Sequence, residues 1–586
     1  MELHLSENAQ KVLEARYLRR NRSGEIVETF EELFSRVASA VSEPELLYGS
    51  AVDARRHREE FLQMMTDLEF LPNSPTLMNA GSAMSQLSAC FVLPINDTIE
   101  DIFDAVKQMA MVQRSGGGTG FSFSKLRPSG DFISSTGGKA SGPVSFMDIF
   151  NCATANIKQG GKRRGANMGV LQADHPDTLE FIRAKSQDGA FENFNLSVLV
   201  DDAFMEAVRQ GGYYELRHPR DGRASGRLNA GEVFKAIYET AWETGDPGLI
   251  FADKINAQNP TPHLGRIVAT NPCGEIPLLD YESCNLGSIN LTRMLDSSSR
   301  HIDWQKLENT VRKGVRFLDN VIDVGRYPIA QIEKMTLGNR KIGLGVMGFA
   351  DMLIQLDVAY DSDKAADLGR EVMKVVSEEA FRVSSRLAEQ RGVYPHWKGS
   401  VHQKNGQAVR NATQTAIAPT GSISIIAGTT PSIEPLFALA YQRAHVLGGR
   451  TLHEVNPLFQ QAMRQSGLDP EQIGRRIRKT GSLDDVDEVP DHLKEIFKTA
   501  LQIPVKRHLQ IQQAFQQYVD NSVSKTINLP EDAKPKDVAD AYWRAWKMGL
   551  KGITIYRYGS KSSQVLQLEE EGDRESTPAS CEKCSI

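Results

Sequence analysis

The sequence predicts an α/β fold behind an N-terminal helical region, and three observations support this. Residues 1–70 are charged and space their apolar side chains three and four positions apart, as in ENAQKVLEARYLRR and ETFEELFSRVASAV, which is typical of amphipathic helices. From Leu71 to about residue 440, short apolar runs alternate with longer helical patterns. Glycine-rich loops such as RSGGGTGFSF and IKQGGKRRGANMG separate the two kinds of segment. This alternation favours parallel strands joined by helical crossovers.

The individual elements follow from local patterns in chain order. Strands are expected at FNLSVLV (194–200), GLIFAD (248–253) and KTINLP (525–530), with a last strand and turn beginning at KGITIYRYGS (551–560). Helices are expected over 305–324 and 364–392, where apolar residues recur with helical spacing. The charged residues 465–500 predict a surface insertion. Residues 567–586 are acidic and lack aromatics, which predicts a flexible tail.

Length and composition narrow the class of protein. A chain of 586 residues could hold about four domains at roughly 150 residues each, and a single large α/β barrel with extensions fits as well. The net charge of -6 argues against a nucleic-acid binder, which usually carries a basic excess. The sequence has no apolar run of the length that crosses a membrane. The N-terminal segment MELHLSENAQ lacks an apolar signal core, so we expect a cytoplasmic protein.

The six cysteines are too few for a disulfide scaffold in a chain of this size, so they indicate catalysis, redox exchange or metal binding. Cys581 and Cys584 form a CxxC in the tail, and such a pair closes and exchanges a disulfide readily. A zinc half-site is the alternative, although no second CxxC or CxxH lies nearby. A mobile dithiol implies an internal disulfide to reduce, for which Cys90 and Cys284 are candidates. Taken singly, each is more typical of a small buried apolar residue.

Cys273 lies in the segment NPCGE, where the flanking Pro and Gly predict a tight turn. Residues two apart in an extended loop point the same way, so Asn271, Cys273 and Glu275 would project together. A carboxylate discourages a neighbouring thiolate, which disfavours a nucleophilic cysteine. The arrangement suits a thiol that transfers a hydrogen atom beside a general base. A chance turn that caps a helix remains the alternative.

Two glycine- and hydroxyl-rich loops could bind phosphate. APTGSISIIAGTTPS (418–432) brings Thr420, Gly421, Ser422 and Ser424 together, and small residues of this kind expose backbone N–H groups to an anion. RSGGGTG (114–120), which includes Gly117, could act similarly. Neither loop matches GxxxxGK[ST], so a P-loop enzyme is excluded. A third loop carries Lys162, Arg163 and Arg164, which suit a phosphate or a base edge; plain turns and a solvated charged face are the alternatives.

Seven motifs occur in order along the chain: LPNSPTLMNAG with SACFVLP, SGGGTGFSFSKLRP, GGKRRGANMG, NPCGEIPL, SCNLGSINL eleven residues later, APTGSIS and the terminal CxxC. Together they resemble the catalytic subunit of a ribonucleotide reductase, most closely the class II, adenosylcobalamin-dependent branch. The resemblance covers almost the whole chain. It implies a ten-stranded α/β barrel of two antiparallel five-stranded half-sheets with a central finger loop, over residues 71–566. Residues 1–70 would be a helical region without an ATP cone, and residues 567–586 the tail.

The resemblance also implies roles for the cysteines and their neighbours. Cys273 would be the thiyl radical that abstracts the 3′ hydrogen of the ribose. Glu275 would deprotonate the 3′ hydroxyl, and Asn271 would hydrogen-bond the ribose hydroxyls. Cys90 and Cys284 would supply two electrons and end as a disulfide. The tail pair, Cys581 and Cys584, would reduce that disulfide again, and Cys152 is interpreted as packing.

Substrate and effector sites follow from the same resemblance. The substrate residues it implies are Ser74, Thr76, Ser88, Ala89, Gly117, Thr420, Gly421, Ser422 and Ser424. The effector residues it implies are Asp97, Thr98, Arg127, Lys162, Arg163 and Arg164. The last three lie on a loop that would carry the identity of a bound dNTP or ATP to the active site, which is allostery between two sites. A thioredoxin- or glutaredoxin-type reductant and a homodimer are expected, and no protein-held metal.

The radical source separates the classes of the family. No ordinary side chain makes a radical unaided, so a cofactor or a partner must start the reaction. Class I subunits receive it from a separate dimetal subunit through two adjacent tyrosines, whereas here Arg557 separates Tyr556 from Tyr558. Class III carries a glycyl radical and a zinc-binding cysteine set near its C-terminus, and this tail has neither. Adenosylcobalamin is therefore expected, with a dimetal partner subunit as the alternative.

Two further hypotheses fit the sequence less well. A catalytically silent nucleotide-binding regulator would keep Asp97 and Arg127 but has no need of five placed cysteines. A thiol oxidoreductase that uses the CxxC alone leaves NPCGE unexplained. The substrate is expected to be a ribonucleoside diphosphate, the nearer resemblance, with a triphosphate as the alternative.

Overall fold

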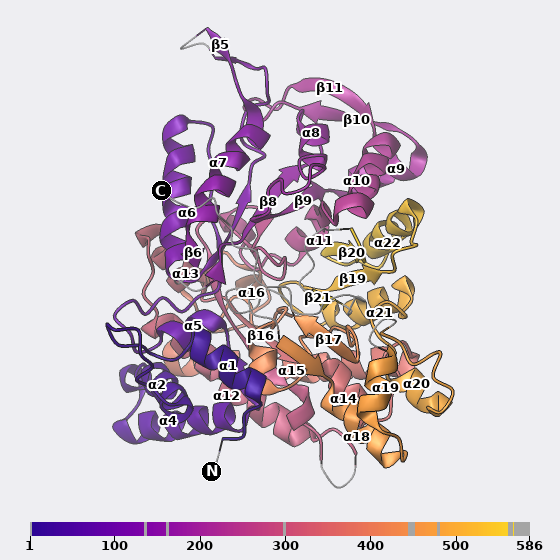
Figure 1. The fold of residues 1–586 in the computed structure, drawn as a ribbon. Helices are drawn as coiled ribbons and strands as arrows, with labels where there is room; N and C mark the ends of the chain where they lie inside the picture. Colours follow the sequence, from indigo (N-terminus) through magenta and orange to yellow (C-terminus); the bar gives the residue numbers. More distant parts are fainter. Residues whose placement is uncertain are drawn as a thin grey trace.

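The N-terminal helices form a layer on one side of a large barrel (Figure 1). The computed structural model describes residues 3–133, 137–159, 163–296, 300–443, 452–477, 481–560 and 566–567. The layer comprises α1 (Glu7–Arg16), α2 (Phe30–Ser42), α3 (Glu45–Tyr48) and α4 (Ala51–Thr66). Helices α2 and α4 each begin with a capping box, in which the N-cap hydroxyl and an acidic side chain three residues later satisfy free backbone N–H groups. The apolar faces of α2 and α4 bury Phe34 and Phe61 in one core with α12 and β16.

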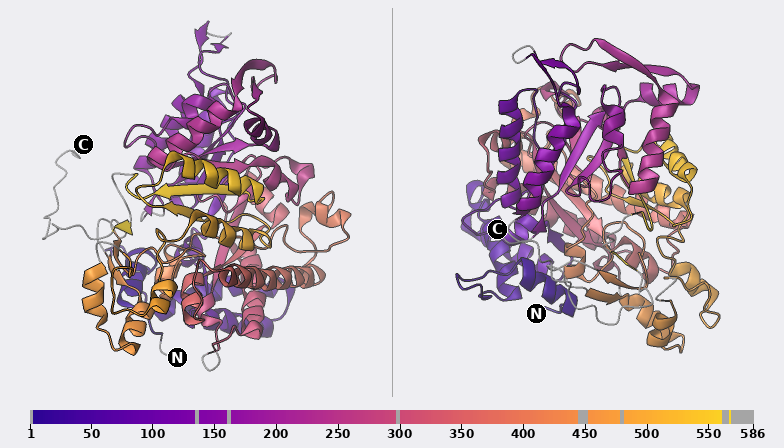
Figure 2. Two further views of the ribbon diagram at one scale, coloured as in Figure 1. Left: turned by 90° about the vertical axis from the view of Figure 1, so that its right-hand side faces the viewer. Right: turned by 45° about the horizontal axis from the view of Figure 1, so that its top comes forward.

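The first half of the barrel is a sheet of parallel strands. In spatial order they are β2 (Cys90–Val92), β3 (Gly118–Ser122), β8 (Asn167–Gln172), β9 (Phe194–Val200) and β12 (Gly248–Phe251). The connecting crossovers contain α6 (Ile99–Arg114), α7 (Gly142–Asn156), α8 (Thr178–Ile182), α9 (Asp202–Gln210) and α10 (Ala230–Thr244). These helices cover the outer face of the half-sheet (Figure 2). The strand predicted at 194–200 is confirmed, and the one predicted at 248–253 is confirmed up to Phe251, where α11 follows.

The second half runs antiparallel to the first and closes the barrel. It comprises β15 (Ser283–Asn290), β16 (Ile342–Met347), the segment 415–417, a strand that enters at Val523 and continues as β19 (Thr526–Leu529), and β20 (Gly552–Arg557). Neighbours within this half pair in parallel, whereas β15 pairs antiparallel with β2 and β20 pairs antiparallel with β12. The described residues therefore form two antiparallel half-sheets of five strands each, which confirms the expected barrel.

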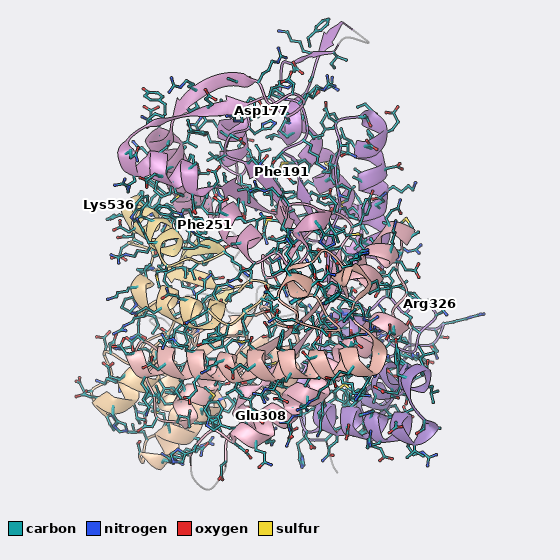
Figure 3. The ribbon with its side chains drawn as sticks, turned by 180° about the vertical axis from the view of Figure 1, so that it is seen from behind. Asp177, Phe191, Phe251, Glu308, Arg326 and Lys536 are labelled. Atoms are coloured by element: carbon teal, nitrogen blue, oxygen red, sulfur yellow. The ribbon has the colours of Figure 1, made fainter. Side chains whose placement is uncertain are left out.

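Long helices cover the second half-sheet. They are α12 (Trp304–Val324), α13 (Ala330–Asn339), α15 (Asp363–Arg391), α21 (Val505–Gln516) and α22 (Pro535–Lys547). Figure 3 shows α15 crossing the back of the molecule beside Glu308 of α12. Arg312 joins the two helices, because its guanidinium pairs with Glu308 and donates to Glu379 at 2.6 Å. Helices predicted at 305–324 and 364–392 are thus α12 and α15, and both predictions are confirmed.

Shorter elements complete the described chain. They are β1 (Phe70–Pro72), α5 (Ser74–Asn79), β4 (Phe132–Ile133), β5 (Gly138–Lys139), β6 (Lys158–Gln159), β7 (Arg163–Arg164), β10 (Tyr213–Arg217), β11 (Ala224–Asn229), α11 (Ala252–Ala257), α14 (Phe349–Gln355), α16 (Val401–Lys404), α17 (Ile423–Ala427), β17 (Ala440–Arg443), β18 (Leu452–Val455) and β21 (Leu566–Gln567). The segment predicted as an insertion, 465–500, contains α19 (Pro470–Ile477) and α20 (Asp491–Ile496). Together with α18 (Pro457–Gln465), which precedes it, this segment packs around Phe459 and Phe497. No helix in the described ranges is long and apolar enough to cross a membrane.

A finger loop lies between β13 (Ala269–Thr270) and β14 (Pro277–Leu278) and contacts both half-sheets from inside the barrel. On the first half-sheet, the Asn195 amide donates to the carbonyl oxygen of Pro272 at 2.8 Å. On the second, the backbone N–H of Ser522 donates to the carbonyl oxygen of Glu275 at 2.8 Å. At Gly120 of β3, an added Cβ would lie 1.7 Å from the Thr270 carbonyl oxygen, so only glycine lets the finger approach this closely.

Replacing Gly120 with alanine is expected to displace the finger loop and to destabilise the protein by about 1–3 kcal/mol, because overpacking forces the backbone to shift. The melting temperature of the purified variant measures this. Gly474 in α19 is the matched control, because an added Cβ there meets no atom within 4 Å. Equal melting temperatures for the two variants would contradict the close approach at Gly120.

Candidate active site

Cys273 lies at the tip of the finger loop and faces a cavity of about 1160 Å³. Its side chain is exposed, in contrast to the buried Cys90 and Cys284. The turn that presents it is closed by the backbone N–H of Gly274, which donates to the Asn271 carbonyl at 3.0 Å. Gly274 adopts a φ of 80°, a conformation that glycine reaches without strain. The sequence prediction of a tight turn around Cys273 is thus confirmed, and the thiol opens onto space for a ligand.

Glu275 lies behind Cys273 and is buried in the barrel. One carboxylate oxygen, Oε1, is 4.0 Å from the Cys90 sulfur. The other, Oε2, is buried and has no hydrogen-bond partner among the described residues. Burial disfavours the charged form and raises the pKa of Glu275 from 4.5 to about 7, although a contact with the Asn271 side chain opposes this. A carboxyl group with a pKa near neutrality is suited to general-base catalysis.

Asn271 holds the finger loop and its side chain reaches Cys90. Its Oδ1 accepts the backbone N–H of Ile276 at 2.9 Å, which fixes the orientation of the amide. The Nδ2 then donates to the Cys90 sulfur at 3.1 Å. Asn271 and Glu275 therefore both contact Cys90, whereas Cys273, which the motif spacing groups with them, is exposed at the tip of the loop.

Cys90 of β2 and Cys284 of β15 are directly opposite each other at the junction of the two half-sheets. Opposed residues of antiparallel strands have Cα atoms about 4.5–5.5 Å apart, which lies within the range that a disulfide requires. Both cysteines are free thiols here. Burial raises the pKa of each thiol above its usual value, and the nearby ammonium group of Lys341 opposes this at Cys284. The pair is thus placed to close a disulfide next to Glu275.

The predicted phosphate loop borders the same cavity. Ser424 and Pro419 line it, and the Ser424 hydroxyl is buried without a hydrogen-bond partner in the described structure. Thr420 adopts a φ of 51° and its hydroxyl accepts the backbone N–H of Ser432 at 2.7 Å, so the loop is tightly folded. An added Cβ at Gly421 meets no atom within 4 Å, which leaves the apex open.

Other predicted substrate residues lie on α5 or at the starts of β2 and β3. Ser74 begins α5, and Thr76 is fully buried with its hydroxyl 2.8 Å from Asn73 Oδ1 and 3.1 Å from the Leu87 carbonyl. The Thr76 hydroxyl is thus engaged by the protein itself. Ser88, Ala89 and Gly117 pack between β2 and β3: the Ser283 hydroxyl donates to Ser88 at 3.3 Å, the Ala89 carbonyl accepts the Gly118 N–H, and a Cβ at Gly117 would lie 2.5 Å from Phe91.

Three of the predicted effector residues, Asp97, Thr98 and Arg127, gather at the N-terminus of α6, whereas Gly165, which follows Arg164, packs against Gln113 in the last turn of that helix. The Arg127 guanidinium contacts both carboxylate oxygens of Asp97, at 3.1 and 2.9 Å. Thr98 is the N-cap of α6, and its hydroxyl accepts the Asp101 N–H at 3.0 Å. Arg163 and Arg164 form β7, which pairs with β6. Lys162, Cys581 and Cys584 lie outside the described residues.

The structure adds contacts to these sites that sequence reasoning missed. Arg220, in the turn between β10 and β11, donates to Asp97 Oδ2 at 2.8 Å. Arg16 of α1 donates to the Ser422 hydroxyl at 3.0 Å. Lys551 lines the cavity and donates to the Asp520 carbonyl at 2.5 Å. Arg16 and Arg220 belong to segments that resemble an ordinary charged surface, and Lys551 begins an apolar strand, so no local motif could have identified these contacts.

Comparisons with known proteins agree with this geometry. The family profile "Ribonucleotide reductase, barrel domain" matches residues 88–409 and 402–556, and "Ribonucleotide reductase, all-alpha domain" matches 3–85. The chain is 47% identical to a protein of Thermoplasma acidophilum named vitamin B12-dependent ribonucleoside-diphosphate reductase, over 96% of this chain and 80% of that protein. A Mycobacterium tuberculosis protein of the same name is 48% identical, over 96% and 81%.

A solved structure shares the fold. It is the Actinobacillus ureae class Id ribonucleotide reductase alpha subunit, with a TM-score of 0.77 and 25% identity, covering 95% of this chain and 97% of that one. The family profiles span both the helical layer and the barrel. The relatives match almost the whole chain at nearly half of its positions. The chain therefore belongs to the ribonucleotide reductase family.

Proposed function

We propose that the chain reduces ribonucleoside diphosphates to 2′-deoxyribonucleotides, with Cys273 as the thiyl radical. The observation that carries this proposal is the meeting of three groups at the finger loop: a thiol open to the cavity, a buried carboxyl with a pKa near 7, and two thiols opposed across a strand pair. These are the hydrogen-atom carrier, the base and the electron store that the reaction needs. The names of the relatives support the diphosphate as substrate.

The chemistry assigns one role to each group. Cys273 takes the hydrogen atom from C3′ of the ribose, and Glu275 takes the proton of the 3′ hydroxyl. The 2′ hydroxyl then leaves as water. Cys90 and Cys284 give two electrons and two protons in all and become a disulfide, while Cys273 returns the hydrogen atom to C3′. The balance is one C–O bond replaced by C–H, one water released and two thiols oxidised.

The proposed radical source is adenosylcobalamin, as the names of the relatives suggest. When bound, this cofactor supplies the organic radical that oxidises a thiol. The cavity fits a second group beside the nucleotide, because about 1160 Å³ exceeds the usual range for one small ligand, about 300–1,000 Å³. The phosphate loop borders one side of it, and Ser197, Gly248 and Thr554 line the wall formed by β9, β12 and β20. This second wall would hold the cofactor.

The test is reduction of a ribonucleoside diphosphate by the purified chain with adenosylcobalamin, a small dithiol and a dNTP effector. We expect turnover with adenosylcobalamin and none with hydroxocobalamin, which lacks the adenosyl group. Tyr556 also lines the cavity. A tyrosine on this wall is a feature that the class I alternative would use. Activity that ignores adenosylcobalamin and requires a separate metal-containing subunit would establish that alternative instead.

Regulation and re-reduction complete the proposal. Asp97, Thr98 and Arg127 would form the site for a dNTP or ATP effector, supported by the ion pair that already joins the first and the last. The effector would act through the loop with Lys162, Arg163 and Arg164, in a homodimer. The tail cysteines, Cys581 and Cys584, would pass electrons from a thioredoxin- or glutaredoxin-type protein to the internal disulfide. Such reductants operate in the cytoplasm, where the reaction is proposed to occur.

A further inference from the structure

Helix α1 of the N-terminal layer connects the two segments predicted to bind substrate. Arg16, in its last turn, donates to the Ser422 hydroxyl of the phosphate loop at 3.0 Å. Tyr17, the next residue, is buried, and its hydroxyl lies 2.8 Å from the Ser74 hydroxyl at the start of α5. Figure 1 shows α1 beside α5. One end of one helix thus contacts both substrate segments, which are far apart in sequence.

The other end of α1 forms part of the cavity wall. Ser6, Glu7 and Asn8 line the cavity that Cys273 faces. The negative charge of Glu7 is matched there by Lys11, whose ammonium group lies 2.6 Å from it. The helix therefore runs from the cavity wall to the phosphate loop and packs against α17, the short helix within that loop.

The loop itself has no cation to balance a phosphate group. Residues 418–432 contain no charged side chain, although a nucleoside diphosphate is strongly anionic. The two lysines on the cavity wall are held by protein oxygens: Lys525 pairs with Glu434 at 2.7 Å, and Lys551 donates to the carbonyls of Asp520 and Asn521. Arg16 brings a guanidinium to the loop, and its planar fork matches the oxygens of a phosphate.

A second observation indicates a ligand at this loop. The Ser424 hydroxyl is fully buried, lines the cavity and has no hydrogen-bond partner in the described structure. A buried polar group without a partner is costly, and a bound acceptor would remove that cost. Ser422 is the N-cap of α17 and Ser424 lies in its first turn, so the residue that Arg16 contacts and the unpartnered hydroxyl belong to the same end of one helix.

We propose that Arg16 is a substrate-phosphate residue, contributed to the barrel by the N-terminal helical layer, and that Tyr17 positions Ser74 beside it. This inference rests on the proposed function and adds the cation of the substrate site. Arg16 would bind the phosphate groups directly, so it would act on nucleotide binding and leave binding of the bare nucleoside unchanged.

The experiment compares binding of cytidine diphosphate and cytidine to the full chain by equilibrium dialysis. In Arg16→Gln, we expect the diphosphate to bind about 10- to 100-fold more weakly, which is what one hydrogen-bonded charge contributes, with cytidine unchanged. Arg20→Gln is the matched control, because Arg20 follows the same helix but bonds to the carbonyls of Gly24 and Glu14. Arg16→Lys keeps the charge but loses the planar fork, so its affinity for the diphosphate should lie between those of the wild type and Arg16→Gln.

Cytidine binding reports whether the variant is folded. If Arg16→Gln unfolds, Arg16→Lys gives the decision, because an unchanged ratio of diphosphate to nucleoside affinity in that variant overturns the proposal. An equal loss in Arg20→Gln would also overturn it, since the effect would then be one of net charge. The binding ratio needs no turnover, so failure of this inference is distinct from failure of the reductase assignment, which activity with adenosylcobalamin decides.

Discussion

Replacing Cys273 with alanine is expected to abolish nucleotide reduction. The sulfur is the group at the tip of the finger loop that faces the cavity, and alanine offers no weak bond from which a hydrogen atom can be drawn. Folding should be unaffected, because the thiol is exposed and its removal leaves no buried void. The measurement is deoxyribonucleotide formation by the purified variant with adenosylcobalamin, a dithiol and an effector, assayed down to a single turnover.

Cys152 is the matched control for this variant. It is also an exposed free thiol, on α7, so Cys152→Ala makes the same chemical change outside the cavity. Wild-type activity is expected there, and effector affinity should be unchanged in both variants. Deoxyribonucleotide formed by Cys273→Ala at a rate near that of Cys152→Ala would exclude a thiyl radical at Cys273.

Replacing Glu275 with glutamine is expected to lower kcat by about 10²- to 10⁴-fold, the usual contribution of a positioned base. Glutamine keeps the size of the side chain but accepts no proton at neutral pH. The Glu275 backbone carbonyl still accepts the Ser522 N–H, so the finger loop should keep its position. The variant keeps the Cys273 thiol. A lower rate would therefore report loss of the base and not loss of the radical.

The pH profile gives the sharper measurement. Burial raises the pKa of Glu275 to about 7, and the base acts only when it is deprotonated. The wild-type rate should therefore fall as pH drops through about 7 and reach a plateau above it. In Glu275→Gln this limb should disappear, leaving a low and flat rate over the same range. A variant that keeps the wild-type limb would show that another group titrates, and Glu275 would not be the base.

Much of the barrel could be predicted because its signals are local. The apolar runs at 194–200 and 248–253 are strands, and the periodic segments at 305–324 and 364–392 are helices, since each pattern is set by residues near in sequence. Segment 415–417 was not predictable as a barrel strand, because only single β-bridges, Leu344 to Thr415 and Ile417 to Val523, pair it with its two neighbouring strands. The closure of the barrel there depends on distant partners that no periodicity encodes.

The candidate site shows the same division. The motif spacing predicts that Asn271, Cys273 and Glu275 project together; in the structure Asn271 and Glu275 lie buried beside Cys90, whereas Cys273 is exposed at the tip of the loop. The raised pKa of Glu275 could not be predicted, because burial is a property of the assembled barrel. Arg16 is a similar case: it reaches Ser422 across a sequence separation of 406 residues.

If Cys90 and Cys284 act as the proposed electron store, a covalent cross-link would form and break in the barrel with every turnover. The two residues face each other where one half-sheet meets the other, so a bond between them would be a staple across the seam of the barrel. Such a cross-link closes a long loop of chain and restricts the unfolded state, which stabilises the folded one. Each round of catalysis would form this disulfide, and each reduction would break it. The protein would thus be most resistant to unfolding just after it has made its product.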